Sequence, residues 1–359
     1  MIIASNIIRV FKTGAHSHRT PLSYAALAPL FENNIRFVDM PEKADVYVFG
    51  HSLDIEAAPR RLVDDWRRRQ RPIILLSEEP FWDTIWGRQP LYSQRIIESP
   101  WGRLPVRQLI HHTSTIFNFE KIPYYLLTNH RFANAYAARF TRNARLSPSE
   151  WRQSWKRRSA DLTFMFERRP EPYHSMSWPE GDIEGLCAWR TEVATQCKNG
   201  VIERIGNSWH ADQPSRHTYI DWHLDKLVQL DGRSRLIGAF ENTHQPNYIT
   251  EKLFDAFACG ALPAYVASHR HRVHEFGLPT TSWLNLAGLS PSQAAKHLDL
   301  ICWDDRAWLA ETADGYAVAQ RKLAELFTDT RIWRQERNRL RDALLSEFEE
   351  CLASAPIGQ

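Results

Sequence analysis

The sequence has few of the features that mark several common classes of protein. Its five cysteines are an odd number with no CxxC pair, which argues against a disulfide framework and against a structural zinc site. No apolar run reaches the ~20 residues of a membrane-spanning helix. The N-terminus lacks the basic leader and the long apolar segment of a signal peptide. We therefore expect a protein without a transmembrane anchor that stays in the cytoplasm.

A strong charge of either sign is also missing. The chain has 45 Lys and Arg against 42 Asp and Glu, which leaves a formal charge of +3. This is only mildly basic, and no RNP or zinc-finger motif accompanies it, so no nucleic-acid partner is expected. Repeats, low-complexity tracts and flexible linkers are absent too. The hydrophobic content of 43% and charged content of 24% are those of a soluble globular protein.

The chain does have length and tryptophan. Its 359 residues suit two domains, which we place at 1–150 and 151–328. A long helix at 329–359 would pack back on the first domain. Fourteen tryptophans are many for this length. Aromatic faces can stack against sugar rings, although most of these side chains are expected to fill the core.

Apolar strand patterns alternate with helical ones in both halves, which favours an α/β fold with parallel sheets. In the first half, strands are predicted at 2–10, 35–39, 45–50, 73–77 and 115–118, and helices at 22–31 and 56–70. In the second half, strands are predicted at 161–166, 201–205, 236–240 and 264–266, and helices at 183–198, 220–230 and 249–258. Residues 90–130 are predicted to be largely irregular, and the last helix spans 330–353.

The stretch 240–266, FENTHQPNYITEKLFDAFACGALPAYV, organises the second half. A buried strand breaks into a polar loop, and an apolar-periodic helix follows until a glycine ends it. In parallel sheets, small molecules bind beyond the carboxyl ends of the strands. The helix start, capped by Asn247 or Thr250, offers unpaired backbone N–H groups, and Lys252 adds a positive charge that suits a bound anion. Each residue taken alone is equally compatible with an ordinary loop, cap or surface charge.

This stretch resembles the signature of the α1,3/α1,4-fucosyltransferase family. Members carry FENS, then YITEK or YVTEK, then a small-residue helix leading to a VP or IP strand, and FEN-T-x4-YITEKL followed by A-x-x-x-G-x-L-P matches this pattern. The resemblance implies the GT-B fold, in which two Rossmann-like domains with parallel sheets face each other across a cleft. The second domain would bind the donor substrate GDP-fucose, and the first a glycan or glycolipid acceptor.

The resemblance also assigns roles to individual residues. Tyr248 and Glu251 would contact the ribose and base of GDP, and Asn242 would help to shape that pocket. Lys252 would hold the diphosphate together with Arg190, because CAWRTEV resembles the family's helix with a diphosphate-pairing arginine. A guanidinium and an ammonium suit a pyrophosphate held without metal. The chain lacks the D-x-D triplet with which related enzymes bind Mg²⁺ or Mn²⁺, so no metal or cofactor is expected.

Glu78 and Glu79 directly follow the buried strand IILLS. A carboxylate at such a strand end can take a proton from a sugar hydroxyl, although paired glutamates there can equally cap the next helix or face water. RPIILLSEEP resembles the family's strand that ends in GEN, whose glutamate is the proposed catalytic base. Glu78 takes the position of that glutamate. Glu79 stays an alternative candidate for the base, because serine replaces the family's glycine in this motif and the correspondence is therefore looser.

The expected activity is that of an inverting glycosyltransferase in protein glycosylation or lipopolysaccharide biosynthesis. Glu78 would deprotonate an acceptor hydroxyl, which attacks GDP-fucose in one displacement and yields an α-fucoside. One alternative is a transferase that uses another nucleotide sugar, such as GDP-mannose, in bacterial lipopolysaccharide core or O-chain synthesis. Another is a non-catalytic protein that binds a nucleotide or a glycan.

A basic segment precedes the Glu78 strand. Arg60–Arg71 holds six arginines in twelve positions of a predicted helix. The simplest interpretation is a solvated helix face. The alternative is electrostatic docking to an anionic membrane surface or a phosphorylated glycolipid, worth ~1 kcal/mol per basic residue, which would place the protein on the inner face of the membrane.

Overall fold

The computed structural model describes residues 7–210 and 220–354. The chain divides into two compact units, of which the first combines Met1–His130 with Arg331–Gln359 and the second is Arg131–Thr330. Both are α/β units built on a mainly parallel sheet, so the predicted α/β class with parallel sheets is confirmed. No described helix has the length and apolar content needed to cross a bilayer.

The sheet of the first unit has six strands, and all neighbouring pairs are parallel except β5 with β6. Its spatial order is β2 (Ile35–Phe37), β1 (Ile8–Lys12), β3 (Val46–Phe49), β4 (Ile73–Leu76), β6 (Gly102–Leu109), β5 (Gln94–Ser99). The β5–β6 hairpin lies where the sequence predicts irregular structure. The predicted strand 2–10 begins outside the described residues, and its observed part starts at Ile8.

The helices α1 (Ser52–Glu56) and α2 (Arg60–Arg69) connect β3 to β4. Their apolar side chains form one core with Tyr47 and Phe49 of β3 and Ile73 and Leu75 of β4. The sequence predicts a single helix over 56–70. Pro59 separates the two because proline lacks the N–H that a continuous helix needs.

Two further predictions in this unit are wrong. Residues 22–31 form successive turns and the short 3₁₀ helix η1 (Ala28–Leu30) instead of an α-helix. Residues 115–118 are not a strand, because η4 (Thr115–Phe117) is a 3₁₀ turn whose cap Ser114 accepts a hydrogen bond from the Ile116 N–H at 3.1 Å. Both are apolar segments too short for periodicity to distinguish helix, strand and turn.

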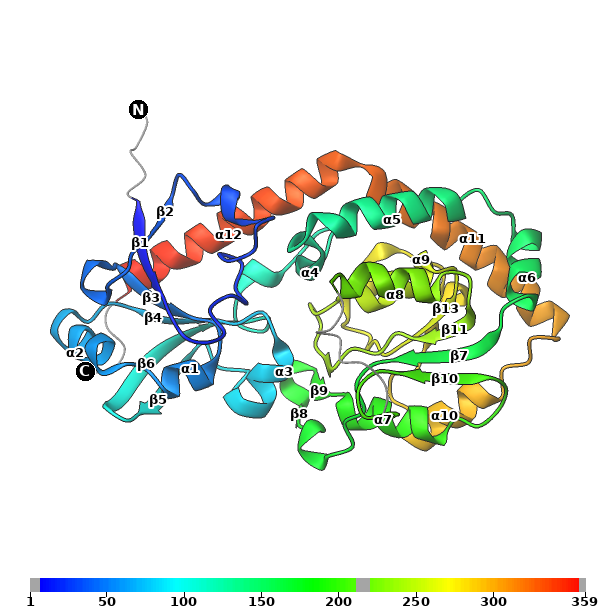
Figure 1. Ribbon diagram of the computed structural model, residues 1–359, viewed down its shortest axis with the longest axis horizontal. Coiled ribbons are helices and arrows are strands. Elements are labelled where there is room, and N and C mark those ends of the chain that lie inside the picture. Colours follow the sequence, from blue (N-terminus) through cyan, green and yellow to red (C-terminus); the bar gives the residue numbers. More distant parts are fainter. Residues whose placement is uncertain (1–6, 211–219, 355–359) are drawn as a thin grey trace. The chain divides into compact units, whose positions relative to one another are not determined.

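The final helix, α12 (Thr330–Ala353), has the predicted bounds and runs alongside the strands of the first unit in Figure 1. The buried carboxylate of Glu336 accepts hydrogen bonds from the backbone N–H groups of Glu120, at 2.7 Å, and Ile122, at 3.2 Å. Glu347 accepts another from Thr115 at 2.6 Å. These bonds join the C-terminal helix to the loop after β6.

The sheet of the second unit has five parallel strands. Their order is β10 (Ile202–Ile205), β7 (Ala160–Met165), β11 (Ser234–Gly238), β13 (Leu262–Tyr265), β14 (Leu284–Asn285). In Figure 1, α7 (Cys187–Gln196) and α10 (Pro291–Asp299) cover one face of this sheet, and α8 (Trp222–Leu230) and α9 (Glu251–Ala258) cover the other. Another long helix, α11 (Arg306–Thr328), follows α10.

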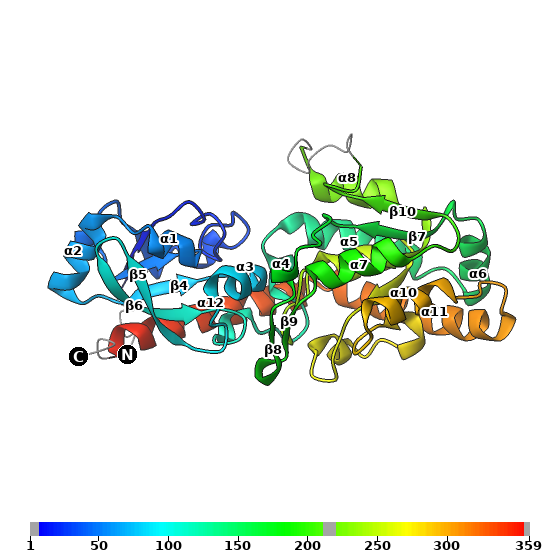
Figure 2. The same ribbon diagram turned by 90° about the horizontal axis from the view of Figure 1, so that it is seen from below.

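A small antiparallel sheet replaces the start of the helix predicted at 183–198. It consists of β8 (Ser177–Trp178), β9 (Ile183–Gly185) and β12 (Thr243–His244), and Figure 2 shows β8 and β9 beside α7. Gly185 makes it possible, because a Cβ at this position would lie only 2.3 Å from the His174 carbonyl oxygen. The helix therefore begins at Cys187.

The first boundary between the units lies at 130/131, not at the predicted 150/151. Helix α5 (His130–Asn143) precedes the predicted boundary, yet the Tyr136 hydroxyl donates to Asp255 at 2.7 Å and the Asn143 amide donates to the Phe257 carbonyl at 3.2 Å. Helix α6 (Pro148–Lys156) follows, and its Trp155 indole N–H donates a hydrogen bond to the Gly260 carbonyl at 3.0 Å. Both helices thus bond to α9 and to the turn that ends it. The second boundary, at 330/331, lies close to the predicted 328/329.

Candidate functional site

The 240–266 stretch forms a strand end, a loop, a helix and a strand. After β11 the loop runs to Thr250, the N-cap of α9, whose hydroxyl accepts a hydrogen bond from the Lys252 N–H. Of the two predicted caps, Thr250 and not Asn247 holds this position. Gly260 ends the helix with a φ of +75°, a conformation that L side chains rarely adopt. The loop therefore lies at the carboxyl end of the sheet, where ligands of parallel sheets bind.

Arg190 and Lys252 reach neighbouring residues of this loop. The buried guanidinium of Arg190 lies 4.7 Å from the ring centroid of Phe166 and donates to the Phe240 carbonyl at 3.2 Å. The ammonium of Lys252 donates to the Glu241 carboxylate at 2.9 Å. Because Phe240 and Glu241 are consecutive, the structure brings both predicted cations to the same end of β11.

The Lys252 ammonium is engaged by groups of the protein itself. It also donates to the Thr250 hydroxyl at 2.8 Å and lies 3.6 Å from Glu251, and its side chain is 22% exposed. Burial works to lower the pKa of Lys252, but the Glu241 and Glu251 carboxylates raise it above its ordinary value. Lys252 therefore stays charged at neutral pH, and its charge is shared between two carboxylates.

Glu241 is the acceptor at the centre of this arrangement. Its buried carboxylate accepts hydrogen bonds from the Thr250 N–H at 2.8 Å, from the Thr250 hydroxyl and from the Tyr265 hydroxyl at 3.4 Å. Burial raises the pKa of Glu241 above its ordinary value, although Lys252 acts in the opposite direction. Glu241 is not among the residues predicted from the sequence, although its position in the FEN motif is a signal that could identify it.

Glu251 is buried among charges. Its carboxylate lies 3.2 Å from the Lys226 ammonium, which also pairs with Asp255 one turn further along α9. Burial alone would raise the pKa of Glu251, but Lys252 and Lys226 hold it well below its ordinary range. Sequence reasoning missed Lys226 and Asp255, because Lys226 lies on α8 and only the fold brings it to α9.

One group of side chains within the described residues has the composition of a metal site. The ligand atoms of His223, Glu251 and Asp255 all lie within 4.8 Å of one another. The Lys226 ammonium pairs with both carboxylates, however, and Lys252 lies 3.6 Å from Glu251, so internal cations already balance their charge. This donor set is therefore better suited to lysine than to a divalent ion.

The other two residues predicted to bind the nucleotide also lie in the loop. The Tyr248 side chain is buried, and its backbone N–H donates to the Gln245 carbonyl at 3.0 Å. Asn242 is half-buried, and its carbonyl accepts from the Leu186 N–H at 2.9 Å, just before α7 begins. Asn242 thus links the loop to the helix that carries Arg190.

Glu78 follows β4 in the first unit, and its carboxylate is almost fully covered. Oε1 accepts a hydrogen bond from Arg19 Nε at 2.6 Å and another from the Tyr24 hydroxyl. Oε2 accepts from the Tyr124 hydroxyl, at the start of α4 (Tyr124–Leu127), at 2.7 Å. Glu79 is the more exposed of the two glutamates, with 13% of its side chain accessible against 1% for Glu78.

The two phenols that hold Glu78 remain donors over the physiological pH range. Burial and the Glu78 carboxylate together raise the pKa of Tyr24 and of Tyr124 well above the ordinary value. Arg19 also lies 3.5 Å from Glu79, so one guanidinium contacts both carboxylates. Sequence reasoning missed Arg19, Tyr24 and Tyr124, since no motif marks them and they are 46 to 59 positions from Glu78.

The arginines of α2 mostly have acidic neighbours. Arg68 and Arg69 each pair with Asp65 at 2.6 Å, and Arg61 pairs with Glu42 at 2.7 Å. Arg60 lies 3.4 Å from Asp64. These ion pairs reduce the positive charge that the helix presents and favour the interpretation as a solvated helix face.

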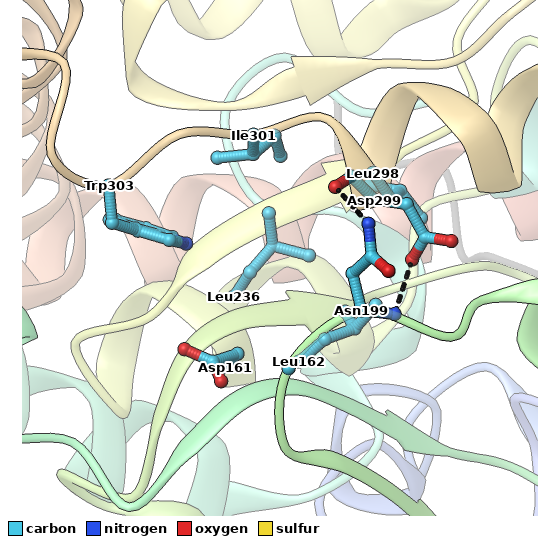
Figure 3. A pocket seen from close by; sticks show the side chains of 9 residues that line it. Asp161, Leu162, Asn199, Leu236, Leu298, Asp299, Ile301 and Trp303 are labelled. Atoms are coloured by element: carbon cyan, nitrogen blue, oxygen red, sulfur yellow. Dashed lines mark hydrogen bonds between the residues drawn. The ribbon is translucent and has the colours of Figure 1, made fainter.

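The pocket in Figure 3 lies at the other end of the second sheet. It measures about 180 Å³ and includes Asp161 and Leu162 at the start of β7. Asp161 accepts from the Val201 N–H at 2.8 Å, and Asp299 accepts from the Asn199 N–H at 3.2 Å. The carboxylates of the pocket thus accept hydrogen bonds from backbone N–H groups. The pocket lies at the end of the strands opposite to the 240–266 loop.

Comparison with known proteins bears on the second unit. Residues 202–311 match the family model described as glycosyltransferase family 10 (fucosyltransferase), C-terminal. The matched range contains Asn242, Tyr248, Glu251 and Lys252, whereas Arg190 and Glu78 lie outside it. The resemblance found in the 240–266 stretch is therefore confirmed over a longer segment.

Known sequences agree with this match. The protein named 4-galactosyl-N-acetylglucosaminide 3-alpha-L-fucosyltransferase 9 from Bos taurus is 32% identical over 100 residues, which are 26% of this chain and 28% of that protein. Its namesake from Mus musculus is 32% identical over 73 residues, 20% of each chain. This chain therefore aligns with less than a third of these relatives' length. Both sequence comparisons indicate a glycosyltransferase domain. Within that class, the matched segment is of the fucosyltransferase type.

Solved structures include more distant neighbours. A crystal structure of an alpha1,3-fucosyltransferase aligns with 93% of each chain at 11% identity and a TM-score of 0.41. Another, of an alpha1,3-fucosyltransferase with GDP-fucose, covers 99% of this chain and 94% of the other at 12% identity and a TM-score of 0.39. At such values the likeness assigns neither a ligand nor a residue to this chain.

Proposed function

We propose that this protein is an inverting glycosyltransferase that moves L-fucose from GDP-fucose to a hydroxyl group of a glycan acceptor. The observation that carries the proposal is the family 10 match over residues 202–311, whose signature loop lies at the carboxyl end of β11. The relatives' printed name, a 3-alpha-L-fucosyltransferase acting on a 4-galactosyl-N-acetylglucosaminide, supports fucose as the transferred sugar.

In this proposal the second unit binds the donor. Arg190 and Lys252 contact the consecutive loop residues Phe240 and Glu241 and would stabilise the diphosphate as negative charge develops on it. Lys252 must exchange its present bonds to Glu241 and Thr250 for phosphate oxygens. Asn242, Tyr248 and Glu251 would shape the nucleotide pocket around the same loop.

Glu78 would act as the general base. Its Oε2 accepts one hydrogen bond, from Tyr124, among the residues that the structure describes. A carboxylate oxygen has capacity for a further donor, which here would be the acceptor hydroxyl. The hydroxyl oxygen then attacks the anomeric carbon as GDP leaves, and the β-linked donor yields an α-fucoside.

The donor can be identified without knowing the acceptor. GDP and GDP-fucose are expected to raise the melting temperature of the purified protein, and UDP-sugars are not, because a ligand stabilises the folded state that binds it. GDP release and the anomeric configuration of the product are then measured with a 4-galactosyl-N-acetylglucosaminide. A larger shift with GDP-mannose would mean that mannose, not fucose, is the transferred sugar. A β-linked product would contradict the inverting mechanism.

A further inference from the structure

Four ring side chains meet at one edge of the first unit's sheet. His16 follows β1, His51 follows β3, and Trp82 and Trp86 follow β4. These strands are adjacent and parallel, so their carboxyl ends lie at the same edge. The ring centroid of His51 lies 4.6 Å from that of His16, 4.8 Å from that of Trp82 and 5.5 Å from that of Trp86. We call these four residues the ring cluster.

The surrounding structure holds the ring cluster in place. The buried carboxylate of Asp54 accepts from the His16 N–H at 2.9 Å and lies 3.0 Å from its Nδ1. Gly50 lets the His16 backbone approach, since a Cβ there would lie 2.4 Å from the His16 carbonyl oxygen. Trp86 belongs to the π-helical turn η3 (Asp83–Gly87), a geometry that is frequent at functional sites.

The cluster is not simply part of the core. Trp86 is 38% exposed, and the His16 side chain is 35% exposed. Core rings of this unit, such as Tyr47 and Phe49, are fully buried. A large aromatic ring that is held in place yet open to solvent has the character of a binding surface.

The ring cluster is also continuous with the Glu78 centre. The Arg19 guanidinium carbon lies 5.1 Å from the Trp82 ring centroid, and Arg19 Nε donates to Glu78. A single side chain therefore separates the rings from the proposed base. A molecule bound on the rings would lie next to the carboxylate that the reaction uses.

We propose that the ring cluster is the acceptor subsite and that Trp86 stacks against a pyranose ring of the acceptor. This inference rests on the proposed function. The apolar C–H face of a sugar packs on an aromatic ring, and its hydroxyls can bond to polar groups at the ring edges, here the imidazole of His16. The cluster lies in the unit that carries Glu78 and not in the unit with the family 10 segment, which favours the acceptor over the nucleotide as its occupant.

His51 is uncharged at neutral pH, which suits a ligand without charge. Burial, reinforced by His16, lowers the pKa of His51 to about 4. At neutral pH this ring is therefore uncharged and adds no attraction for a diphosphate. A neutral imidazole can exchange hydrogen bonds with the hydroxyls of an uncharged saccharide.

The test compares two exposed tryptophans of the same unit. Trp86→Ala is expected to raise KM for the 4-galactosyl-N-acetylglucosaminide at saturating GDP-fucose by about tenfold, a loss of ~1.4 kcal/mol of binding free energy, because the sugar loses the aromatic face on which it packs. Trp86→Phe, which keeps an aromatic face, is expected to stay within about threefold of the wild type. Trp101 is 40% exposed but lies in the β5–β6 turn, so Trp101→Ala is the matched control and should leave KM unchanged.

Saturation-transfer NMR with the same disaccharide tests the subsite without the donor. Transfer to one face of a sugar ring is expected for the wild type and for Trp101→Ala, and its loss for Trp86→Ala. An acceptor KM of Trp86→Ala within twofold of the wild type, or a rise in KM for GDP-fucose instead, overturns the acceptor subsite. Failure of the wild type to release GDP from GDP-fucose overturns the proposed function, and the NMR experiment still decides what the rings bind.

Discussion

The two centres of this molecule hold their carboxylates in different ways. Glu78 in the first unit is held by one guanidinium and two phenols, all brought from distant parts of the chain. In the second unit, Glu241, Glu251 and Asp255 meet the ammonium groups of Lys226 and Lys252. The second arrangement is a closed network of ion pairs. Within the described part of the chain, the first has a single cation, Arg19, so removing one charge should have different consequences in the two units.

The largest expected effect is at Glu78. Glu78→Gln should lower turnover by about 10² to 10⁴, the usual contribution of a general base, because the amide cannot accept the hydroxyl proton. Glu79→Gln makes the same change one position further on and is expected to lower turnover by less than about tenfold. Turnover of both variants is measured with GDP-fucose, and melting temperatures show whether each one folds. The opposite ranking would assign the base to Glu79.

Lys252→Ala should have two effects at once. The sequence alone predicts that turnover is lost, by about 10²-fold, while the fold stays intact. The structure adds a loss of stability, about 3–5 kcal/mol, because the buried Glu241 carboxylate loses its ammonium. Turnover and denaturant unfolding measure the two effects separately.

A double variant separates the two roles of Lys252. Combining Lys252→Met with Glu241→Gln removes both charges of the pair, so stability should recover while turnover stays low. Recovery of both would make Lys252 a structural counter-ion that does not act on the leaving group. Normal turnover in Lys252→Ala would remove the leaving-group argument altogether.

The smallest effect is expected at Asp83, a buried acid in the first unit with no ammonium partner among the described residues. Its Oδ2 has no hydrogen-bond partner there, and burial raises its pKa well above the ordinary value. A raised folded-state pKa means that the native state binds the proton more tightly than the unfolded state. Stability from this group is therefore full below the unfolded pKa, near 3.9, and is lost as pH rises through the folded pKa.

Asp83→Asn removes the loss of stability that ionisation of the Asp83 carboxyl causes at higher pH. Its melting temperature should exceed that of the wild type at pH 7 by roughly 2–4 °C, the shift that ~1 kcal/mol produces in a folding unit of about 150–250 residues. The difference should disappear near pH 3.5, where the wild-type carboxyl is protonated in both states. Calorimetry at the two pH values measures it, and an equal difference at both would mean that ionisation of Asp83 is not its cause.

Much of the parallel-sheet architecture could be predicted from the chain. Central strands of both sheets, such as β3, β4, β11 and β13, lie in apolar runs, and α12 has the predicted bounds because its apolar positions keep helical spacing over 24 residues. Apart from the β5–β6 hairpin, whose strands mix polar and apolar residues, the failures are at short segments. Residues 22–31 and 115–118 are too brief for a period to show, and the β9 strand depends on pairing with Thr243, 58 positions from Gly185.

The amino-acid sequence alone specifies the loop of residues 240–266, because a strand end, a cap and a helix start depend on neighbouring residues. It also placed Lys252 and Glu251 there. The partners of those charges, in contrast, depend on the packing of the folded chain. Lys226 reaches Glu251 from another helix, Arg190 reaches Phe240 across 50 positions, and Tyr24 and Tyr124 reach Glu78 from opposite directions along the chain. Such contacts depend on how the helices and loops pack around a sheet, and local sequence does not record that packing.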